Sequence, residues 1–346
     1  MTTTPASIFA RAYEALENED FDGVLGAMAE ATETGVGEDD PRYRYLRFMT
    51  EWLDEEATEQ QLEGLFEGAS DLLDDAAELS DSAEAARITL DLADVLAQYG
   101  EIDDVEHALR TLSERSDISP EADGEARMMR AQIQLEINED SEEALEILDG
   151  AHPSLHEDAG YVGLRAAVLS DLDRSDEAIE QLRAAVERHD DTELRYQLGV
   201  TLRRGDRNDE AIEQLLEVRR RDLVEHGVTP DEPVPTEEVE DLRRRMEDVL
   251  DTLPDPVMAR VAAATIRVER WAGEDAVRNG ADPRTTVAFE GQPISDDSEA
   301  KVDALVVYRD AIVAHIDDDE QIADALAYGL VEEFDRFFDL ELIPGT

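Results

Sequence analysis

A helical pattern that recurs every 33 or 34 residues constrains the fold of this chain more than any other feature. In residues 160–218, two consecutive segments each carry four positions at the spacing i, i+3, i+4, i+7, which share one side of an α-helix. Nine residues after each stripe, a second stripe opens at a small residue, Ala178 in one segment and Ala211 in the next. A weaker upstream copy opens its second stripe at Ala144. The pattern predicts tandem helical hairpins.

The period and the small residues resemble the tetratricopeptide repeat. The resemblance is carried by Leu198-Gly199, by the turn Gly205-Asp206 and by the runs 176–180 and 209–213. Small residues at these places let the two helices of a hairpin approach each other closely. We expect an α-solenoid of about six such hairpins over residues 1–226, with the first two as degenerate copies.

The repeat pattern stops at His226, and Pro230, Pro233 and Pro235 follow. Proline lacks a backbone N–H and restricts the residue before it to extended conformations, so residues 227–236 are predicted to form a linker. Strand-like segments and a last helix lie beyond it, at 265–269, 286–290, 305–308 and about 319–338. The expected fold is mainly α: an α-solenoid of tetratricopeptide-like hairpins, then a small α+β domain at 237–346.

The chain is strongly acidic, with 89 Asp and Glu against 31 Lys and Arg and a formal net charge of −58. The acidic residues are spread along every predicted helix, and Lys301 is the only lysine. This composition is similar to that of proteins from cytoplasms that hold molar salt, where the screening length is roughly 3 Å and like charges barely repel. Nucleic acid is a poor partner for such a surface, because phosphate binding needs clustered Lys and Arg.

The sequence carries none of the features that direct a chain to a membrane or an export route. The N-terminal residues show neither a basic leader nor an apolar run of signal-peptide length. No stretch approaches the ~18 apolar residues that a transmembrane helix needs. There is no cysteine, which excludes disulfides and thiolate chemistry. We expect a cytoplasmic protein without a membrane partner.

The order helix, strand, glycine-turned strand, strand, helix over roughly residues 240–341 resembles the minimal zincin family of zinc metallopeptidases. The segments that carry this resemblance are 249–254, 289–294, 307–309 and Phe337-Phe338. The last helix of that family holds the motif H-E-x-x-H. Aligned through the preceding strand and the trailing aromatic residues, this chain has Val331, Glu332 and Asp335 at the three motif positions.

The motif needs two imidazoles one helical turn apart to hold zinc, and a glutamate to polarise the bound water. Val331 cannot bind a metal, Asp335 offers at most one oxygen, and Glu332 has no metal-bound water to activate. We therefore expect no catalytic residue, no metal and no cofactor. Glu332 and Asp335 would be solvated, and the buried face of the helix would consist of Ile322, Leu326, Leu330 and Phe334. The alternative is a zinc metallopeptidase with a rebuilt metal site.

Other histidines and arginines favour structural roles. His152 and His156 have the spacing i, i+4, but Pro153 disfavours a helix through them, and two histidines leave a zinc shell incomplete. His315 has no histidine or cysteine nearby. Three arginine clusters favour ion pairing with the abundant acids over a partner site, the first two at helix ends: residues 203–204, 219–221 and 243–245.

Tetratricopeptide solenoids bind peptides on the concave face that their first helices line, and the resemblance implies the same face here. It places on that face Arg87, Asp91, Asp94, Met129, Arg130, Ile133, Tyr196, Gln197, Val200 and Arg203. The clamp that such proteins use for acidic C-termini needs lysines and asparagines that this chain does not supply. The expected function is a non-catalytic scaffold or adaptor for a protein or peptide, whose identity the sequence leaves open, as it does the oligomeric state.

Overall fold

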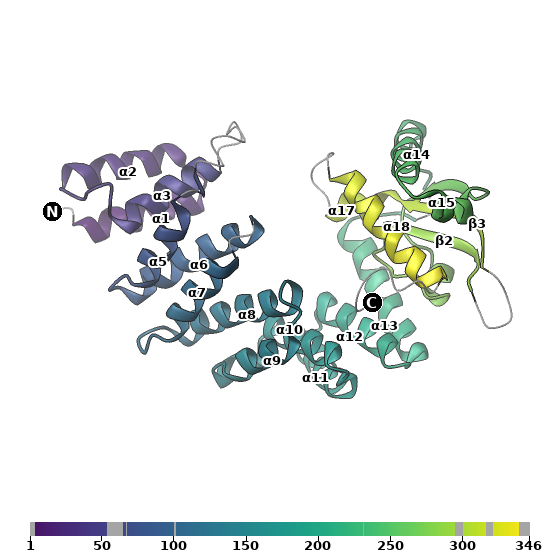
Figure 1. The fold of residues 1–346 in the computed structure, drawn as a ribbon, viewed down its shortest axis with the longest axis horizontal. Helices are drawn as coiled ribbons and strands as arrows, with labels where there is room; N and C mark the ends of the chain where they lie inside the picture. Colours follow the sequence, from purple (N-terminus) through teal and green to yellow (C-terminus); the bar gives the residue numbers. More distant parts are fainter. Residues whose placement is uncertain are drawn as a thin grey trace. The chain divides into compact units, whose positions relative to one another are not determined.

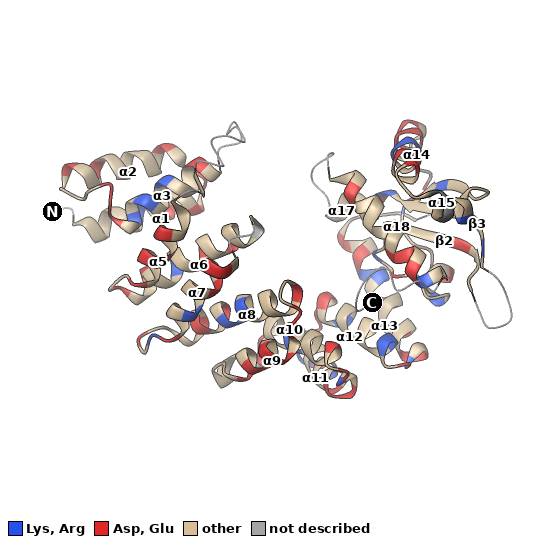
Figure 2. Cartoon of the chain, in the orientation of Figure 1, with Lys and Arg blue, Asp and Glu red and all other residues tan. Residues whose placement is uncertain are grey.

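The computed structural model describes residues 4–53, 65–66, 68–99, 102–230, 232–294, 300–315 and 321–338. Over these residues the chain is mainly α-helical, with many helical hairpins and a small mixed sheet near the C-terminal end (Figure 1). It divides into two compact units, Met1–Leu172 and Asp173–Thr346, which are described separately. Acidic residues occur along the helices of both units (Figure 2).

Unit 1 is built of helical hairpins. Its helices are α1 (Pro5–Glu17), α2 (Phe21–Glu33), α3 (Pro41–Trp52), α5 (Ala69–Ala77), α6 (Ser82–Gln98), α7 (Ile102–Ser113), α8 (Pro120–Glu136), α9 (Ser141–Asp149) and α10 (Ala159–Asp171), with a 3-10 turn η1 (Pro153–Glu157). Helix α1 packs on α2, α6 on α7 and α8 on α9. The prediction of tandem hairpins is confirmed. Residues 54–64, where part of the second hairpin was expected, lie outside the described residues.

The turns within the hairpins share one backbone feature. Glu19, Glu139 and Asp206 each lie between the first and second helix of a hairpin, with φ of 56°, 54° and 58°. A residue in this left-handed region reverses the chain over a very short connection. The following Asp20 and Asp140 then accept hydrogen bonds from backbone N–H groups in the first turn of the second helix.

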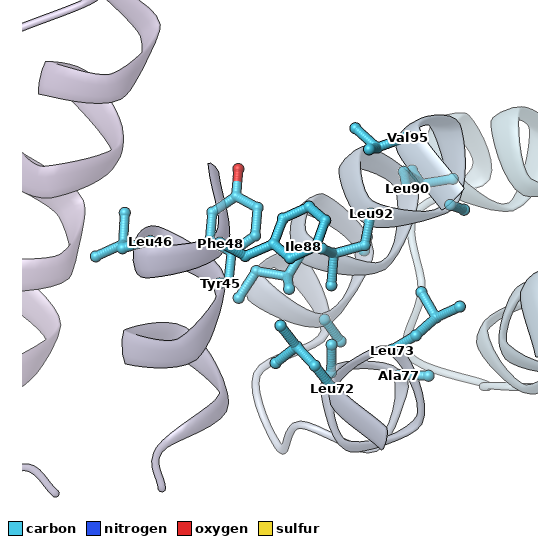
Figure 3. Packing of buried hydrophobic residues seen from close by; sticks show 14 of the residues in the cluster. Tyr45, Leu46, Phe48, Leu72, Leu73, Ala77, Ile88, Leu90, Leu92 and Val95 are labelled. Carbon is cyan, nitrogen blue, oxygen red and sulfur yellow. The ribbon is translucent and has the colours of Figure 1, made fainter. Parts of the chain in front are cut away.

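The core of unit 1 is one continuous hydrophobic cluster that extends from α1 to α8. Figure 3 shows side chains of α3, α5 and α6 meeting in this core. Tyr45, Leu46, Leu73 and Ile88 are almost fully buried there. Burying a large apolar side chain contributes about 1.5–3 kcal/mol, so stacking of consecutive hairpins supplies the stability that no single hairpin has.

Unit 2 combines helices with the sheet. Its helices are α11 (Ser175–His189), α12 (Thr192–Arg204), α13 (Asn208–Glu225), α14 (Thr236–Asp251), α15 (Asp255–Val261), α16 (Glu274–Arg278), α17 (Arg309–His315) and α18 (Ile322–Phe338), and its strands are β1 (Thr265–Glu269), β2 (Val287–Gln292) and β3 (Lys301–Tyr308). The order is β1-β3-β2, with β1 parallel and β2 antiparallel to β3. Gly291 has φ of 145° at a bulge, where a Cβ would lie 2.1 Å from the Lys301 carbonyl oxygen. Glycine is therefore required at this bulge.

Both faces of the sheet are covered. Helices α14 and α18 cover one face, where Phe289 and Leu305 pack with Phe334. On the other face, Val306 and Tyr308 share a core with Leu215 of α13. The last repeat hairpin and the sheet are thus parts of one packed body, although Pro230, Pro233 and Pro235 separate them in the sequence. The sequence predicted a linker at 227–236 between two domains. Whether the residues on its two sides fold independently stays a prediction.

Details of three predicted elements differ from the structure. Strand β3 begins at Lys301, upstream of the predicted 305, because its first half alternates polar and apolar residues. The arginines at 219–221 lie inside α13, which continues to Glu225, so the prediction that they end a helix is wrong. Helix α18 begins at Ile322, while Asp319 lies outside the described residues. None of the described helices is long and apolar enough to cross a membrane.

Candidate partner-binding surface

The first helices of unit 1 present a connected polar surface. Arg87 of α6 pairs with Glu17 of α1 at 2.8 Å, and its guanidinium lies 5.1 Å from the ring centroid of Tyr13, also on α1. One helical turn further, Asp91 accepts a 2.5 Å hydrogen bond from the hydroxyl of Tyr45 on α3. These five residues, together with Asp94 of α6 and Glu125 of α8, are called the first-helix face below: Tyr13, Glu17, Tyr45, Arg87, Asp91, Asp94 and Glu125.

Crowded carboxylates dominate the electrostatics of the first-helix face. Burial raises the pKa of Asp91, and the nearby Asp94 and Glu17 add to this, against the Tyr45 hydrogen bond. Burial, together with the charges of Asp91 and Asp94, also raises the pKa of Glu125. These carboxylates repel one another, so a cationic group placed among them would relieve that repulsion.

The predicted contact residues on α8 lie mostly in the interior. Arg130 is 8% exposed and pairs with Glu106 of α7 at 2.9 Å. Ile133 is 5% exposed and belongs to the core, and Met129 packs against the same core with part of its surface exposed. Arg130 and Ile133 therefore pack α8 against its neighbours and are not accessible to a partner. On α6, by contrast, Arg87 and Asp94 are exposed.

The predicted contact residues on α12, in unit 2, are covered by the chain itself. The hydroxyl of Tyr196 donates a 2.9 Å hydrogen bond to Asp282, and Arg203 donates to the carbonyl oxygen of Ala281 at 3.4 Å. Gln197 and Val200 of the same helix are half-buried, and among the described residues the side-chain oxygen of Gln197 has no hydrogen-bond partner. Residues 281–284, which precede β2, thus occupy the face that the resemblance assigns to a peptide.

Arg284 is the main contact of this segment. Its guanidinium reaches Glu193 of α12 at 2.6 Å and Asp222 of α13 at 2.9 Å, and it lies 4.6 Å from the ring centroid of Tyr196. The side chain of Asp222 is only 4% exposed, so Arg284 compensates a buried charge. A tyrosine ring and two carboxylates therefore hold an arginine that comes from an irregular segment.

Buried titratable groups surround this contact. Burial raises the pKa of Asp282, against hydrogen bonds from the Arg284 backbone and Tyr196 that favour its charged form. Burial lowers the pKa of Arg203. The pKa of Glu332 on α18 is raised by burial and by the charges of Asp282 and Glu333. No sequence pattern predicted this cluster, because its members are far apart along the chain.

The three positions that the resemblance aligned with the zincin motif lie on α18. Val331 and Glu332 are half-buried, whereas Asp335 is 9% exposed, so the prediction that Asp335 is solvated is wrong. The predicted burial of Leu326, Leu330 and Phe334 is confirmed, with Ile322 partly buried beside them. Asp335 lies in the C-terminal part of α18, where Glu333, Phe334, Phe337 and Phe338 are also buried.

Sequence reasoning missed Glu333, which is 4% exposed. It accepts a 3.0 Å hydrogen bond from the backbone N–H of Phe289 and pairs with Arg336 at 2.7 Å. The i, i+3 spacing of Glu333 and Arg336 was the available signal. This buried carboxylate fastens α18 to β2.

Among the residues that the structure describes, no three or more His, Cys, Asp or Glu side chains are grouped so that they could hold a metal ion. His152 caps η1, accepting from the Ser154 N–H at 3.2 Å, and His156 stacks on Tyr161. The side chain of His315 is outside the described set.

Comparison with known proteins agrees with the repeat architecture. A sequence model described as a tetratricopeptide repeat matches residues 173–256, a segment that runs from α11 through the proline-rich residues into α15. No curated protein matches the sequence. A solved structure of the TPR2AB domain of yeast Sti1 in a pHSP90 complex aligns with 16% identity over 63% of this chain and 91% of that chain, at a TM-score of 0.25. That TM-score is too low to support an argument. The chain is thus built largely of helical hairpins, and residues 173–256 are similar to the tetratricopeptide repeat.

Proposed function

We propose that this protein is a non-catalytic scaffold that binds a protein or peptide through the first-helix face of unit 1. The observation that carries the proposal is the contrast between two repeat surfaces. On α12 the corresponding surface is occupied by residues 281–284, whereas on α6 Arg87 and Asp94 are exposed beside Asp91. A repeat array offers an extended surface of this kind because each hairpin contacts only its neighbours.

The proposal that α18 is not catalytic is supported by its side chains. Val331 has no atom that binds a metal, and Glu332, at the position of the family's general base, lies beside Tyr328.

Site-specific photo-crosslinking tests the scaffold proposal. A photoreactive residue is placed in the full chain at Asp94, on the first-helix face, or at the exposed Glu142 on α9 as the matched control. In a lysate of the source cells, position 94 should yield a discrete crosslinked protein and position 142 should not. Excess unmodified chain should compete for the partner and reduce the amount of crosslinked product, whereas excess D91R/D94R chain should not. A product that forms only from position 142 would contradict the proposed surface.

Elemental analysis tests the absence of catalysis. Protein purified without chelators should contain no stoichiometric zinc, because α18 supplies at most the Asp335 oxygen where catalytic zinc requires three protein ligands. A ratio near one zinc per chain, lost together with peptide hydrolysis in the E332Q or D335A variants, would establish the metallopeptidase instead.

A further inference from the structure

A cavity opens between α1 and α6 beside the first-helix face. It has a volume of about 240 Å³ and is lined by Ala10, Tyr13, Glu14, Glu17, Ala83, Glu84 and Arg87. A cavity of ~150 Å³ is large enough to hold benzene, so this one has room for the planar end of a side chain. The alanines at 10 and 83 leave the space open because their side chains are short.

Tyr13 lines this cavity and carries an unused hydrogen-bonding group, its hydroxyl. Tyr13 is 7% exposed, and its hydroxyl oxygen is buried without a hydrogen-bond partner among the described residues. A buried polar group without a partner costs about 1–3 kcal/mol. A ligand that supplies an N–H group to this oxygen would recover that energy.

The charge of the lining favours a cation. The charged residues of the lining are three acids, Glu14, Glu17 and Glu84, and one base, Arg87, which is already paired with Glu17. Glu84 faces Arg42 at 3.5 Å, but Arg42 makes its shorter ion pair, 2.7 Å, with Asp40. Glu14 has no ion pair within the described part of the chain. Glu14 of α1 thus has no cationic partner among the described residues, and Glu84 of α6 shares its partner Arg42 with Asp40.

Unit 2 contains an example of the ligand that such a surface accepts. On α12, Arg284 lies over the ring of Tyr196 and is held by two carboxylates. The α1–α6 cavity has a tyrosine, Tyr13, with Arg87 over its ring, and it adds carboxylates from two helices. Guanidinium suits them better than ammonium, because it is more weakly hydrated and its planar fork matches carboxylates.

From these observations we propose that the α1–α6 cavity binds the guanidinium of an arginine side chain of the partner protein. Glu84 and Glu14 accept its N–H groups from opposite sides, and the Tyr13 oxygen accepts a further one. This inference rests on the proposed function, of which it specifies the partner's chemistry. The surface ion pair of Arg87 and Glu17, with side chains 40% and 60% exposed, shifts aside at little energetic cost.

The test uses the full chain and two blocked pentapeptides, acetyl-Gly-Gly-Arg-Gly-Gly-amide and its analogue with citrulline, the neutral urea of the same shape. Titration followed by backbone amide NMR should show the arginine peptide shifting resonances of α1 and α6, with Kd at least about 10-fold lower than for citrulline. A lysine peptide should bind more weakly than the arginine peptide.

Variants assign the effect to the cavity. E84Q and Y13F should each weaken arginine binding about 10-fold, because each removes an acceptor of a charged donor. E78Q, which removes one negative charge on an exposed residue that does not line the cavity, should change Kd less than about 2-fold. Circular dichroism confirms that each variant is folded.

Equal binding of the arginine and citrulline peptides, or equal affinity in wild type, E84Q and Y13F, would overturn the inference. That result would leave the scaffold proposal standing if the crosslink from position 94 still formed. Loss of the crosslink with arginine binding intact would reject the scaffold and keep the cavity as an arginine site.

Discussion

The hydroxyl of Tyr196 hydrogen-bonds to the carboxylate of Asp282 at 2.9 Å, across 86 residues of sequence. The bond joins the first helix of the last repeat hairpin to the segment that leads into β2. A terminal hairpin of a repeat array has one face without a neighbour, and this face must be covered for the array to stay soluble. In unit 2 the sheet covers it, with Leu215 buried against Val306 and residues 281–284 lying on α12.

Substitution of Arg284 by alanine should strongly destabilise unit 2. The change leaves Asp222, 4% exposed, as a buried charge without its ion pair, and this typically costs about 3 kcal/mol. The measurement is urea unfolding of the full chain. R278A is the control, since Arg278 and its partner Glu274 are more than half exposed and such a pair contributes about 0–1 kcal/mol. Equal effects of the two substitutions would refute the role assigned to Arg284.

Replacing Asp282 by asparagine should reduce the pH dependence of stability. Burial raises the pKa of Asp282 above its ordinary value of 3.8, so the folded state binds this proton more tightly than the unfolded state. The resulting stabilisation is fully present below pH 3.8 and is lost as the pH rises through the folded-state pKa. Tyr196, Arg203, Arg284 and Glu332 face this carboxyl group.

Thermal unfolding of wild type and D282N between about pH 4 and pH 7 measures the effect. The wild type should lose stability relative to D282N as the pH rises, because asparagine cannot ionise and keeps an acceptor for Tyr196. Titratable groups that do not interact with Asp282 cancel in the difference between the two proteins, and Glu332 adds to it with the same sign, because the Asp282 charge raises its pKa. A difference that does not change with pH, or changes with the opposite sign, would show that Asp282 is charged in the folded protein throughout.

Gly199 should not tolerate even a methyl group. A Cβ at this position would lie 2.7 Å from side-chain carbons of Leu215 on α13, so G199A would push α12 and α13 apart. Overpacking of this kind costs about 1–3 kcal/mol. G205A is the matched control, because its nearest contact would be an ordinary 3.5 Å. If G199A melted at the same temperature as G205A, the close approach of the two helices would be refuted.

The acidic composition predicts that stability depends on salt. The screening length is roughly 10 Å at 0.1 M and 3 Å at 1 M, so low salt exposes neighbouring carboxylates such as Asp91 and Glu125 to each other's charge. The melting temperature should fall as KCl is lowered below about 0.5 M. The melting temperature of the D91N/E125Q variant should fall less steeply as KCl is lowered. A melting temperature that stays constant between about 0.1 and 3 M would contradict salt adaptation.

Helical periodicity predicted the hairpins because it depends on neighbours within a few residues. The small residues Gly199 and Ala211 marked where helices approach closely, and Leu326, Leu330 and Phe334 marked the buried face of α18. The prediction of which side chains on a helix are exposed to solvent or to a partner was poorer. Arg130 and Ile133 share a stripe that packs inward, and Asp335 is buried although its neighbour Glu332 is only half-buried.

The sequence alone therefore determined the helical hairpins, the places of the three strands and the last helix. These features depend on residue type and on local spacing. The tertiary structure decided which repeat surface is occupied and which is exposed, because contacts such as Tyr196 with Asp282 and Tyr13 with Arg87 join residues that are remote in sequence. No local pattern records such a contact, since its energy comes from burial and charge pairing that exist only after the helices have packed.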